Sequence, residues 1–267
     1  MSSSLENKVA LVTASTRGIG LAIVKNLAEK GAIVYMAARR LDYANQLAES
    51  MNKEYGWNIR VVRFDAYDSS CYPEMMKTIS DQEGRLDILV NNFGTSDPLK
   101  DKTIEDTEWE DFKKTVDIDL ESVFRTTQEA IPLMKDEGGS IINISSIGGS
   151  VPDVSQIAYG TSKAAINYLT KLFAVQLGRY QIRSNAVLPG MTATDAVKEN
   201  LSDQFRHIFM RQTPLQRMAT PEEIAAAVAY FASDEAAFTT GQILEVAGGF
   251  GLGTPVYGDL MNSSNRR

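Results

Sequence analysis

The chain alternates between short apolar segments and longer amphipathic ones, and this alternation limits its fold more than any other feature. The apolar segments predict strands over residues 8–13, 32–38, 59–64, 86–90, 140–144, 184–188 and 242–246. The segments between them predict helices over 20–30, 41–55, 72–82, 109–134, 159–178 and 221–233. Nearly continuous apolar strands that alternate with helices indicate a parallel sheet covered on both faces. We therefore expect an α/β fold with a doubly wound parallel sheet.

The pattern runs through the chain of 267 residues without a linker, a charge block or an internal repeat. We therefore expect a single domain over residues 1–267. Two segments lie outside the alternation: residues 191–218 mix apolar and basic side chains, and residues 250–267 lack clear periodicity. Because long excursions on such scaffolds often cover a site, we interpret 191–218 as a substrate lid and 250–267 as a C-terminal tail.

Composition and charge exclude several classes of protein. The net charge of −7 argues against a nucleic-acid partner, since such proteins carry a basic face. The longest apolar run, residues 224–232, is too short to span a membrane, and no secretory signal is visible. The single cysteine, Cys71, suits a reducing compartment, so we expect a cytoplasmic protein. The single histidine, His207, lacks acidic neighbours, and we expect no metal site.

The segment after the first predicted strand has the composition of a phosphate-binding turn. It reads Thr-Ala-Ser-Thr-Arg-Gly-Ile-Gly over residues 13–20. Glycine lets the backbone approach a pyrophosphate, and the following helix offers free N–H groups. Two glycines are also typical of an ordinary tight turn, but their place after the first strand favours a dinucleotide cofactor. The candidates are Thr13, Ser15, Thr16, Arg17, Gly18, Ile19 and Gly20.

The second predicted strand is followed by Arg39 and Arg40, at the position that distinguishes NAD from NADP. An acidic residue there usually holds the ribose hydroxyls of NAD, whereas arginine pairs with the 2′-phosphate of NADP. No acidic residue occurs before Asp42, and Arg17 is a second cation within reach. Two solvated arginines would give the same pattern, but we favour NADP as the cofactor.

Polar residues also follow the third and fourth predicted strands. Asp65, which Ala66 follows, is a candidate to bond the adenine amino group. Asn91, Asn92 and Gly94 lie at the carboxyl edge of the sheet, where ligands bind in this kind of fold. Asparagine and aspartate are also common turn residues, so these positions alone do not establish a site.

Tyr159 and Lys163 are the candidate catalytic pair, because a spacing of four residues places both on one helix face. A nearby ammonium favours the phenolate form of tyrosine, which can exchange a proton with an alcohol near neutral pH. Ser146 follows the preceding strand, and its hydroxyl could hold the substrate oxygen. Taken alone, a tyrosine and a lysine at this spacing also occur by chance on helix surfaces.

These motifs occur in the order that short-chain dehydrogenases/reductases show, and the chain resembles this family over nearly its whole length. The resemblance implies a Rossmann-type fold, hydride transfer to or from a nicotinamide, and commonly a homotetramer. It implies that Ser146, Tyr159 and Lys163 are the catalytic trio, that Tyr159 and Lys163 also bind the cofactor, and that Lys163 does so at the nicotinamide ribose. The further cofactor residues that it implies are Asn91, Pro189, Gly190, Thr192 and Thr194.

Within that family, several stretches of the chain resemble the clostridial 7α-hydroxysteroid dehydrogenases in particular. They are residues 34–40, 87–94, 143–149, 151–155 and 245–255. The implied reaction is the reversible oxidation of the 7α-hydroxyl of a bile acid, a steroid, to the 7-ketone. One alternative is a reductase of another carbonyl: position 3 or 12 of a steroid, a 3-oxoacyl thioester or a sugar. Another is a cofactor-binding protein with weak chemistry.

Two residues depart from the family pattern. Ala14 replaces the first glycine of the turn, and because alanine needs φ below zero we expect a slightly different turn. Asp119 replaces an asparagine whose backbone carbonyl normally contributes to a water chain that reaches the lysine. A carboxylate near Lys163 would oppose phenolate formation. We therefore count Asp119 among the catalytic residues and predict an oxidation optimum at higher pH.

The predicted lid supplies an apolar surface that suits a rigid steroid. Met191, Phe205, Phe209, Met210 and Met218 lie in or beside it, and methionine adapts to irregular surfaces. The same side chains would also suit the buried face of a surface helix. Three arginines of this segment are candidates either to meet a bile acid carboxylate or to form a solvated face; they are Arg206, Arg211 and Arg217.

Overall fold

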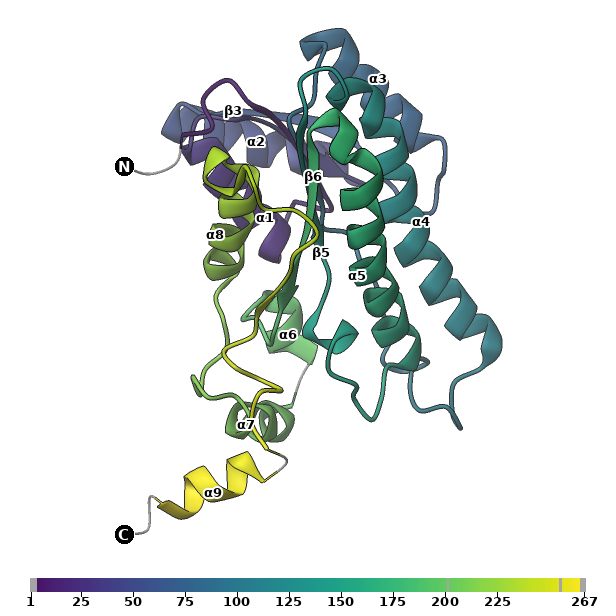
Figure 1. Cartoon of the computed structure of the whole chain (residues 1–267), viewed down its shortest axis with the longest axis vertical. Coiled ribbons are helices and arrows are strands. Elements are labelled where there is room, and N and C mark those ends of the chain that lie inside the picture. Colours follow the sequence, from purple (N-terminus) through teal and green to yellow (C-terminus); the bar gives the residue numbers. More distant parts are fainter. Residues whose placement is uncertain (1–3, 201, 255, 265–267) are drawn as a thin grey trace.

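One parallel sheet of seven strands organises the computed structural model, which describes residues 4–200, 202–254 and 256–264 (Figure 1). The strands are β1 (Val9–Thr13), β2 (Ile33–Ala38), β3 (Asn58–Arg63), β4 (Ile88–Asn91), β5 (Gly139–Ile144), β6 (Ile182–Pro189) and β7 (Ile243–Val246). Their spatial order is β3-β2-β1-β4-β5-β6-β7, so the winding direction reverses between β1 and β4. The predicted doubly wound, Rossmann-type single domain is confirmed.

Helices cover both faces of the sheet. One face carries α1 (Gly18–Glu29), α2 (Leu41–Tyr55) and α8 (Pro221–Ala232), and the other carries α3 (Cys71–Glu83), α4 (Trp109–Met134) and α5 (Ile157–Leu177). Figure 1 shows α1 beside α8, with α4 and α5 together on the far side of the sheet. Leu11 and Val12 are adjacent in β1 but belong to different cores, because successive side chains of a strand point to opposite faces.

Local signals set several helix boundaries. α2 ends at Gly56 and α3 at Gly84, whose φ angles of 72° and 70° favour glycine. α8 begins with a capping box in which Thr220 and Glu223 each accept the other's backbone N–H. Short 3₁₀ helices complete the layers: η1 (Ile147–Gly149), η2 (Gly178–Tyr180) and η3 (Asp234–Ala236). Within the described ranges, no helix has the length and apolar character that crossing a membrane requires.

Three further helices lie beyond the carboxyl ends of the strands, in the segments outside the sequence pattern (Figure 1). α6 (Asp195–Asn200) and α7 (Asp203–Arg211) belong to the proposed lid, and α9 (Tyr257–Ser264) belongs to the tail. The rings of Phe209 and Phe250 stack at 4.1 Å, and Arg211 pairs with Asp259 at 2.8 Å. Lid and tail therefore contact each other. Position 201 of the lid and positions 255 and 265–267 of the tail lie outside the described residues.

Candidate active site

A cavity of roughly 980 Å³ opens at the carboxyl ends of the strands. Segments that are far apart in the sequence line it: the start of α1, the end of β4, the loop after β5, the first turns of α5 and the segment after β6. The expected site residues among its lining are Ile19, Asn92, Gly94, Ser146, Tyr159, Lys163, Pro189, Gly190, Thr192 and Thr194. The cavity lies where ligands bind in doubly wound folds, and its volume suits a small organic ligand.

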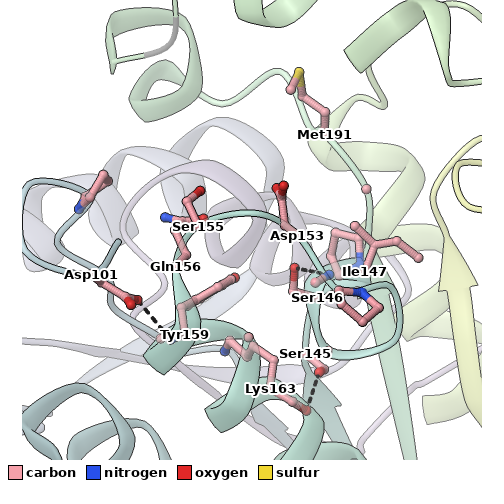
Figure 2. Close-up of a pocket in the computed structure, with 18 of the residues that line it drawn as sticks. Asp101, Ser145, Ser146, Ile147, Asp153, Ser155, Gln156, Tyr159, Lys163 and Met191 are labelled. Atoms are coloured by element: carbon pink, nitrogen blue, oxygen red, sulfur yellow. Dashed lines mark hydrogen bonds between the residues drawn. The ribbon is translucent and has the colours of Figure 1, made fainter. Parts of the chain in front are cut away.

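Tyr159 and Lys163 lie one turn apart on α5 and line the same cavity (Figure 2). The Lys163 Nζ is 5.4 Å from the centroid of the Tyr159 ring. Lys163 is buried, and its Nζ donates a hydrogen bond of 3.3 Å to the Ile144 carbonyl at the end of β5. The helix thus presents a phenol and a buried ammonium side by side to the same cavity.

Ser146 lines the cavity from the loop after β5 (Figure 2). Its Oγ accepts a hydrogen bond of 3.1 Å from the Gly148 N–H at the start of η1. Because that bond uses an oxygen lone pair, the hydroxyl hydrogen stays available to donate to a substrate oxygen. The neighbouring Ser145 has a different role, since its Oγ donates to the Lys163 carbonyl at 3.0 Å and ties the loop to α5.

The start of α5 is capped by a distant residue, which the sequence analysis missed. Gln156, immediately before the helix, has a φ of 58° and makes no side-chain cap. Instead, the Asp101 carboxylate accepts hydrogen bonds from the N–H groups of Ala158 and Tyr159, at 2.8 and 2.9 Å (Figure 2). A carboxylate here satisfies free N–H groups and interacts favourably with the helix dipole. Asp101 therefore fixes the first turn of the helix that carries Tyr159.

No local signal could have identified Asp101. It lies 58 residues before Tyr159, in the loop after β4, and is only 2% exposed. Sequence signals for a helix start concern the residue just before the first turn. Here that position holds a glutamine in a left-handed conformation, and the cap comes from another element.

Asp119, which replaces the expected asparagine, is fully buried in α4. Its Oδ1 accepts a hydrogen bond from the Thr95 N–H and its Oδ2 accepts one from the Ser162 hydroxyl, both at 2.8 Å. Burial raises the pKa of this carboxyl above its ordinary value, and the charge of Lys163 opposes that shift. The carboxyl thus links the loop after β4 to the catalytic helix, and its ionised form is disfavoured by burial.

The turn after β1 corrects one expectation. Ala14 has a φ of 52°, so the expectation that alanine keeps φ below zero is wrong. The left-handed conformation costs a residue with a Cβ roughly 1–2 kcal/mol. The Asn92 side-chain amide donates to the carbonyls of Thr13 and Ala14, at 2.9 and 3.1 Å. These contacts from the residue after β4 help to hold the turn with Ala14 in its left-handed conformation.

The turn and its surroundings form a cradle that fits a dinucleotide. A Cβ on Gly20 would lie 2.7 Å from the Ala14 carbonyl oxygen, and a Cβ on Gly94 would lie 2.5 Å from the Lys163 Nζ. Both glycines therefore permit a close approach of neighbouring atoms that a Cβ would block. The buried Ser15 hydroxyl has no hydrogen-bond partner among the described residues. The α1 N-terminus, which has no side-chain cap, adds free N–H groups that suit a pyrophosphate.

Two expected cofactor residues hold the sheet edge together. The Thr13 Oγ1 accepts a hydrogen bond of 2.9 Å from the Asn92 N–H. The Asn91 amide donates to Thr127 in α4 and to Asn143 in β5, at 3.1 and 2.8 Å. Its side chain is therefore turned toward the helix layer, and Asn91 is not among the residues that line the cavity. Direct contact of Thr13 or Asn91 with a cofactor stays a prediction.

The remaining expected cofactor residues lie outside the main cavity. Arg17, Arg39 and Arg40 are exposed, and no ion pair of theirs occurs within the described part of the chain. The Asp65 carboxylate accepts a hydrogen bond from a turn N–H, and Ala66 lines a separate surface cavity. Their contacts with a cofactor, like those of Thr16 and Gly18, stay predictions.

Only some of the expected lid residues line the main cavity. Met191, Phe205 and Phe209 line the main cavity, whereas Met210 lines a separate cavity of roughly 100 Å³. Met218 lines neither of these two cavities, so the apolar surface toward the site is smaller than the sequence suggested.

The three arginines of the lid region do not face the main cavity. Each one has an ion-pair partner: Arg206 pairs with Asp203, Arg211 with Asp259 and Arg217 with Glu223. None of the three is among the residues that line the main cavity. Of the two interpretations of these side chains, the structure therefore supports the solvated face and not a substrate contact.

His207 lies exposed on α7. The described residues contain no group of three or more histidine, cysteine, aspartate or glutamate side chains that could hold a metal ion.

Comparisons with known proteins agree with this geometry. A family model described as enoyl-(acyl carrier protein) reductase matches residues 13–251. The 7α-hydroxysteroid dehydrogenases of Clostridium sardiniense and Paraclostridium sordellii are 47% and 48% identical to the chain, over 96% and 97% of it and 97% of each relative. A solved 7α-hydroxysteroid dehydrogenase, complexed with NADH and 7-oxo glycochenodeoxycholic acid, superposes with a TM-score of 0.87 at 30% identity. That superposition covers 92% of this chain and 95% of the solved one.

Proposed function

Because the chain belongs to the short-chain dehydrogenase/reductase family, we propose that it is an NADP-dependent 7α-hydroxysteroid dehydrogenase. The proposed reaction is the reversible oxidation of the 7α-hydroxyl of a bile acid to the 7-ketone by hydride transfer. The observation that carries it is the meeting of Ser146, Tyr159 and Lys163 in one cavity beside an apolar lid. Relatives with this activity that match almost the whole chain support the choice of substrate.

In the proposed reaction, the residues of the chain hold the alcohol and move its proton. Ser146 donates a hydrogen bond to the substrate oxygen. Tyr159 takes the hydroxyl proton during oxidation and returns it to the oxygen during reduction. Lys163 favours the phenolate and holds the nicotinamide ribose. A bound nicotinamide supplies the acceptor for the hydride.

The preference for NADP rests on charge at the end of β2. Arg39 and Arg17 are exposed without ion-pair partners in the described ranges, and no acidic residue follows β2 before Asp42. A guanidinium without a carboxylate partner suits a phosphate, whereas the ribose hydroxyls of NAD are usually held by an acid. The solved relative with NADH shows that a similar enzyme takes the other cofactor, so the two must be compared directly.

The test is the absorbance at 340 nm of purified protein with NADP or NAD and one of three bile acids. Cholate and chenodeoxycholate carry a 7α-hydroxyl, whereas deoxycholate lacks it. We expect reduction of NADP with the first two acids and none with deoxycholate. Turnover of deoxycholate would move the reaction to position 3 or 12. Equal rates with NAD would contradict the cofactor preference, and no turnover of any steroid would contradict the substrate.

We also propose that the chain forms a homotetramer and acts in the cytoplasm, without a nucleic-acid or membrane partner. Apolar side chains on the outer faces of α4 and α5 support an assembly, since Phe124, Tyr168 and Val175 are 49%, 65% and 83% exposed. Light scattering should give four times the chain mass of 29.3 kDa. A monomer mass at micromolar concentration would contradict the assembly.

A further inference from the structure

The charges inside the cavity point to one residue for substrate recognition. Among the described residues, two basic side chains line the cavity: Lys163 beside Tyr159 and Lys102 in the loop after β4. Lys163 is buried and bonded to a β5 carbonyl, whereas Lys102 is exposed. A bile acid carries a carboxylate at the end of its side chain, away from the ring hydroxyls. A cation that lines the same cavity would give that carboxylate a partner.

Among the described residues, no carboxylate forms an ion pair with Lys102. By contrast, Lys100, two residues earlier, pairs with Asp111 at 3.1 Å. The adjacent Asp101 directs both carboxylate oxygens at the first turn of α5. The other acidic residue that lines the cavity, Asp153, accepts a hydrogen bond from the Val154 N–H. Lys102 is therefore available to an anion.

The backbone of Lys102 is fixed relative to Tyr159. Its N–H donates to the Thr107 Oγ1 at 2.9 Å, and its carbonyl accepts from the Ile157 N–H at 3.2 Å, in the first turn of α5. Asp101 bonds the next two N–H groups of the same turn. The base of the Lys102 side chain and the proposed proton acceptor therefore belong to one hydrogen-bonded unit. Such a unit can hold an anion and a reacting hydroxyl at a defined separation.

Apolar side chains that line the same cavity as Lys102 match the rest of such a ligand. Ile104 and Val154 line the cavity although they are 79% and 85% exposed. Phe205 adds an aromatic side chain from the lid. Exposed apolar residues next to a single available cation suit an amphipathic anion with a large apolar body.

From these observations we propose that Lys102 binds the anionic end of the steroid substrate. The proposal rests on the function proposed above and identifies the substrate as an acidic steroid rather than a neutral one. Lys102 also takes the substrate-binding role for which the arginines of the lid were candidates, because their guanidinium groups are paired with carboxylates. A cation that fixes one end of the substrate acts on binding and not on the chemical step.

The test compares cholate with methyl cholate, its neutral ester, as substrates of the full-length protein with NADP. The variants are Lys102→Gln and, as a matched control, Lys100→Gln. We expect Lys102→Gln to raise the KM for cholate about tenfold, since a charge-assisted hydrogen bond is lost. The KM for the ester, kcat and the midpoint of thermal unfolding should stay unchanged. Lys100→Gln should leave all four quantities unchanged.

The other outcomes of this experiment contradict either the role of Lys102 or the proposed function. Oxidation of acid and ester with equal KM by the unaltered chain would overturn the role of Lys102 and leave the proposed function standing. An equal rise of both KM values in Lys102→Gln would also overturn it, because the lysine would then act through its apolar stem. Oxidation of neither compound would overturn the proposed function itself, and the role of Lys102 with it.

Discussion

The two walls of the active-site cavity are built in different ways. On the sheet side, buried and half-buried polar side chains tie separate elements together: half-buried Asn92 bonds the turn after β1, Asn91 bonds β5 and α4, and Asp101 caps α5. On the lid side, α7 contains no buried residue. Its described contacts to the tail include one stacked pair of phenylalanines and one ion pair.

Under the proposed function, this difference separates the part of the site that carries out the chemistry from the part that selects the substrate. Proton transfer depends on distances that must hold within a fraction of an ångström, and buried hydrogen bonds between elements provide such positions. Recognition of a large apolar ligand depends more on area than on exact angles, so exposed side chains on a short helix suffice. Substitutions on the sheet side should therefore lower kcat, and substitutions on the lid should raise KM.

The largest effect is expected for Tyr159→Phe on the sheet side. Removal of the hydroxyl removes the proposed proton acceptor, so kcat should fall by about 10³-fold while the affinity for NADP stays unchanged. Steady-state kinetics and a fluorescence titration of cofactor measure the two quantities. Tyr55→Phe, at an exposed position at the end of α2, is the control. A variant that keeps more than a tenth of the activity would remove Tyr159 from the mechanism.

The next largest effect is expected for Asp101→Asn. Asparagine offers one acceptor oxygen where aspartate offers two, so one N–H at the start of α5 loses its partner. We expect kcat to fall about tenfold with little change in KM, and the free energy of unfolding to fall by about 1–2 kcal/mol. Kinetics and urea denaturation test this, with the exposed Asp97→Asn in the same loop as control. Unchanged kcat would show that the cap does not position Tyr159.

On the lid side, Phe209→Ala should produce the opposite pattern. The ring lines the cavity and stacks on Phe250, so its loss removes apolar contact with the substrate and loosens the lid. We expect the KM for cholate to rise about fivefold to tenfold with kcat nearly constant. Phe238→Ala, at a fully exposed position, should change neither constant. A fall in kcat comparable to the rise in KM would break the distinction between the walls.

A smaller effect is expected for Ala14→Gly, which should stabilise the fold rather than weaken a function. Relief of the left-handed alanine should raise the free energy of unfolding by about 1 kcal/mol. Ala226→Gly, at an exposed position within α8, should lower it by a similar amount, because glycine is disfavoured inside a helix. Urea denaturation of both variants gives the comparison. Destabilisation by Ala14→Gly would show that the turn is not strained.

The smallest effect concerns the buried carboxyl of Asp119. Burial raises the pKa of this carboxyl in the folded protein. The stability that the carboxyl contributes is therefore complete below its unfolded pKa of about 3.9, and it falls as the pH rises through the folded pKa. The free energy of unfolding of Asp119→Asn, relative to the unaltered chain, should therefore increase as the pH is raised from 4. Urea denaturation at several pH values measures the slope, and a difference that does not vary with pH would contradict it.

The same variant tests the catalytic role predicted for Asp119. At pH values where the Asp119 carboxyl is ionised, its loss removes a charge that opposes phenolate formation, so the oxidation optimum of Asp119→Asn should move to lower pH. An unchanged pH–rate profile would exclude Asp119 from the mechanism and leave it as a link between the β4 loop and α5.

Local patterns in the sequence determined most of the sheet and the position of its site. Apolar strands and amphipathic helices carry their periodicity within a few residues, so α2 and α4 begin and end where the pattern predicts. Tyr159 and Lys163 share a helix face by spacing alone, and the glycine turn is identified by its place after β1. The helices of the lid and tail were not predicted, because their short segments carry little periodicity.

Only the tertiary structure decided how distant segments act on one another. The cap from Asp101, the left-handed φ of Ala14 and the availability of Lys102 all depend on contacts between residues that belong to different elements. Arg211 of the lid looks available in sequence and is paired in space with Asp259 of the tail. A sequence records which groups a chain carries, but hydrogen bonds and ion pairs between distant segments exist only after the chain has folded.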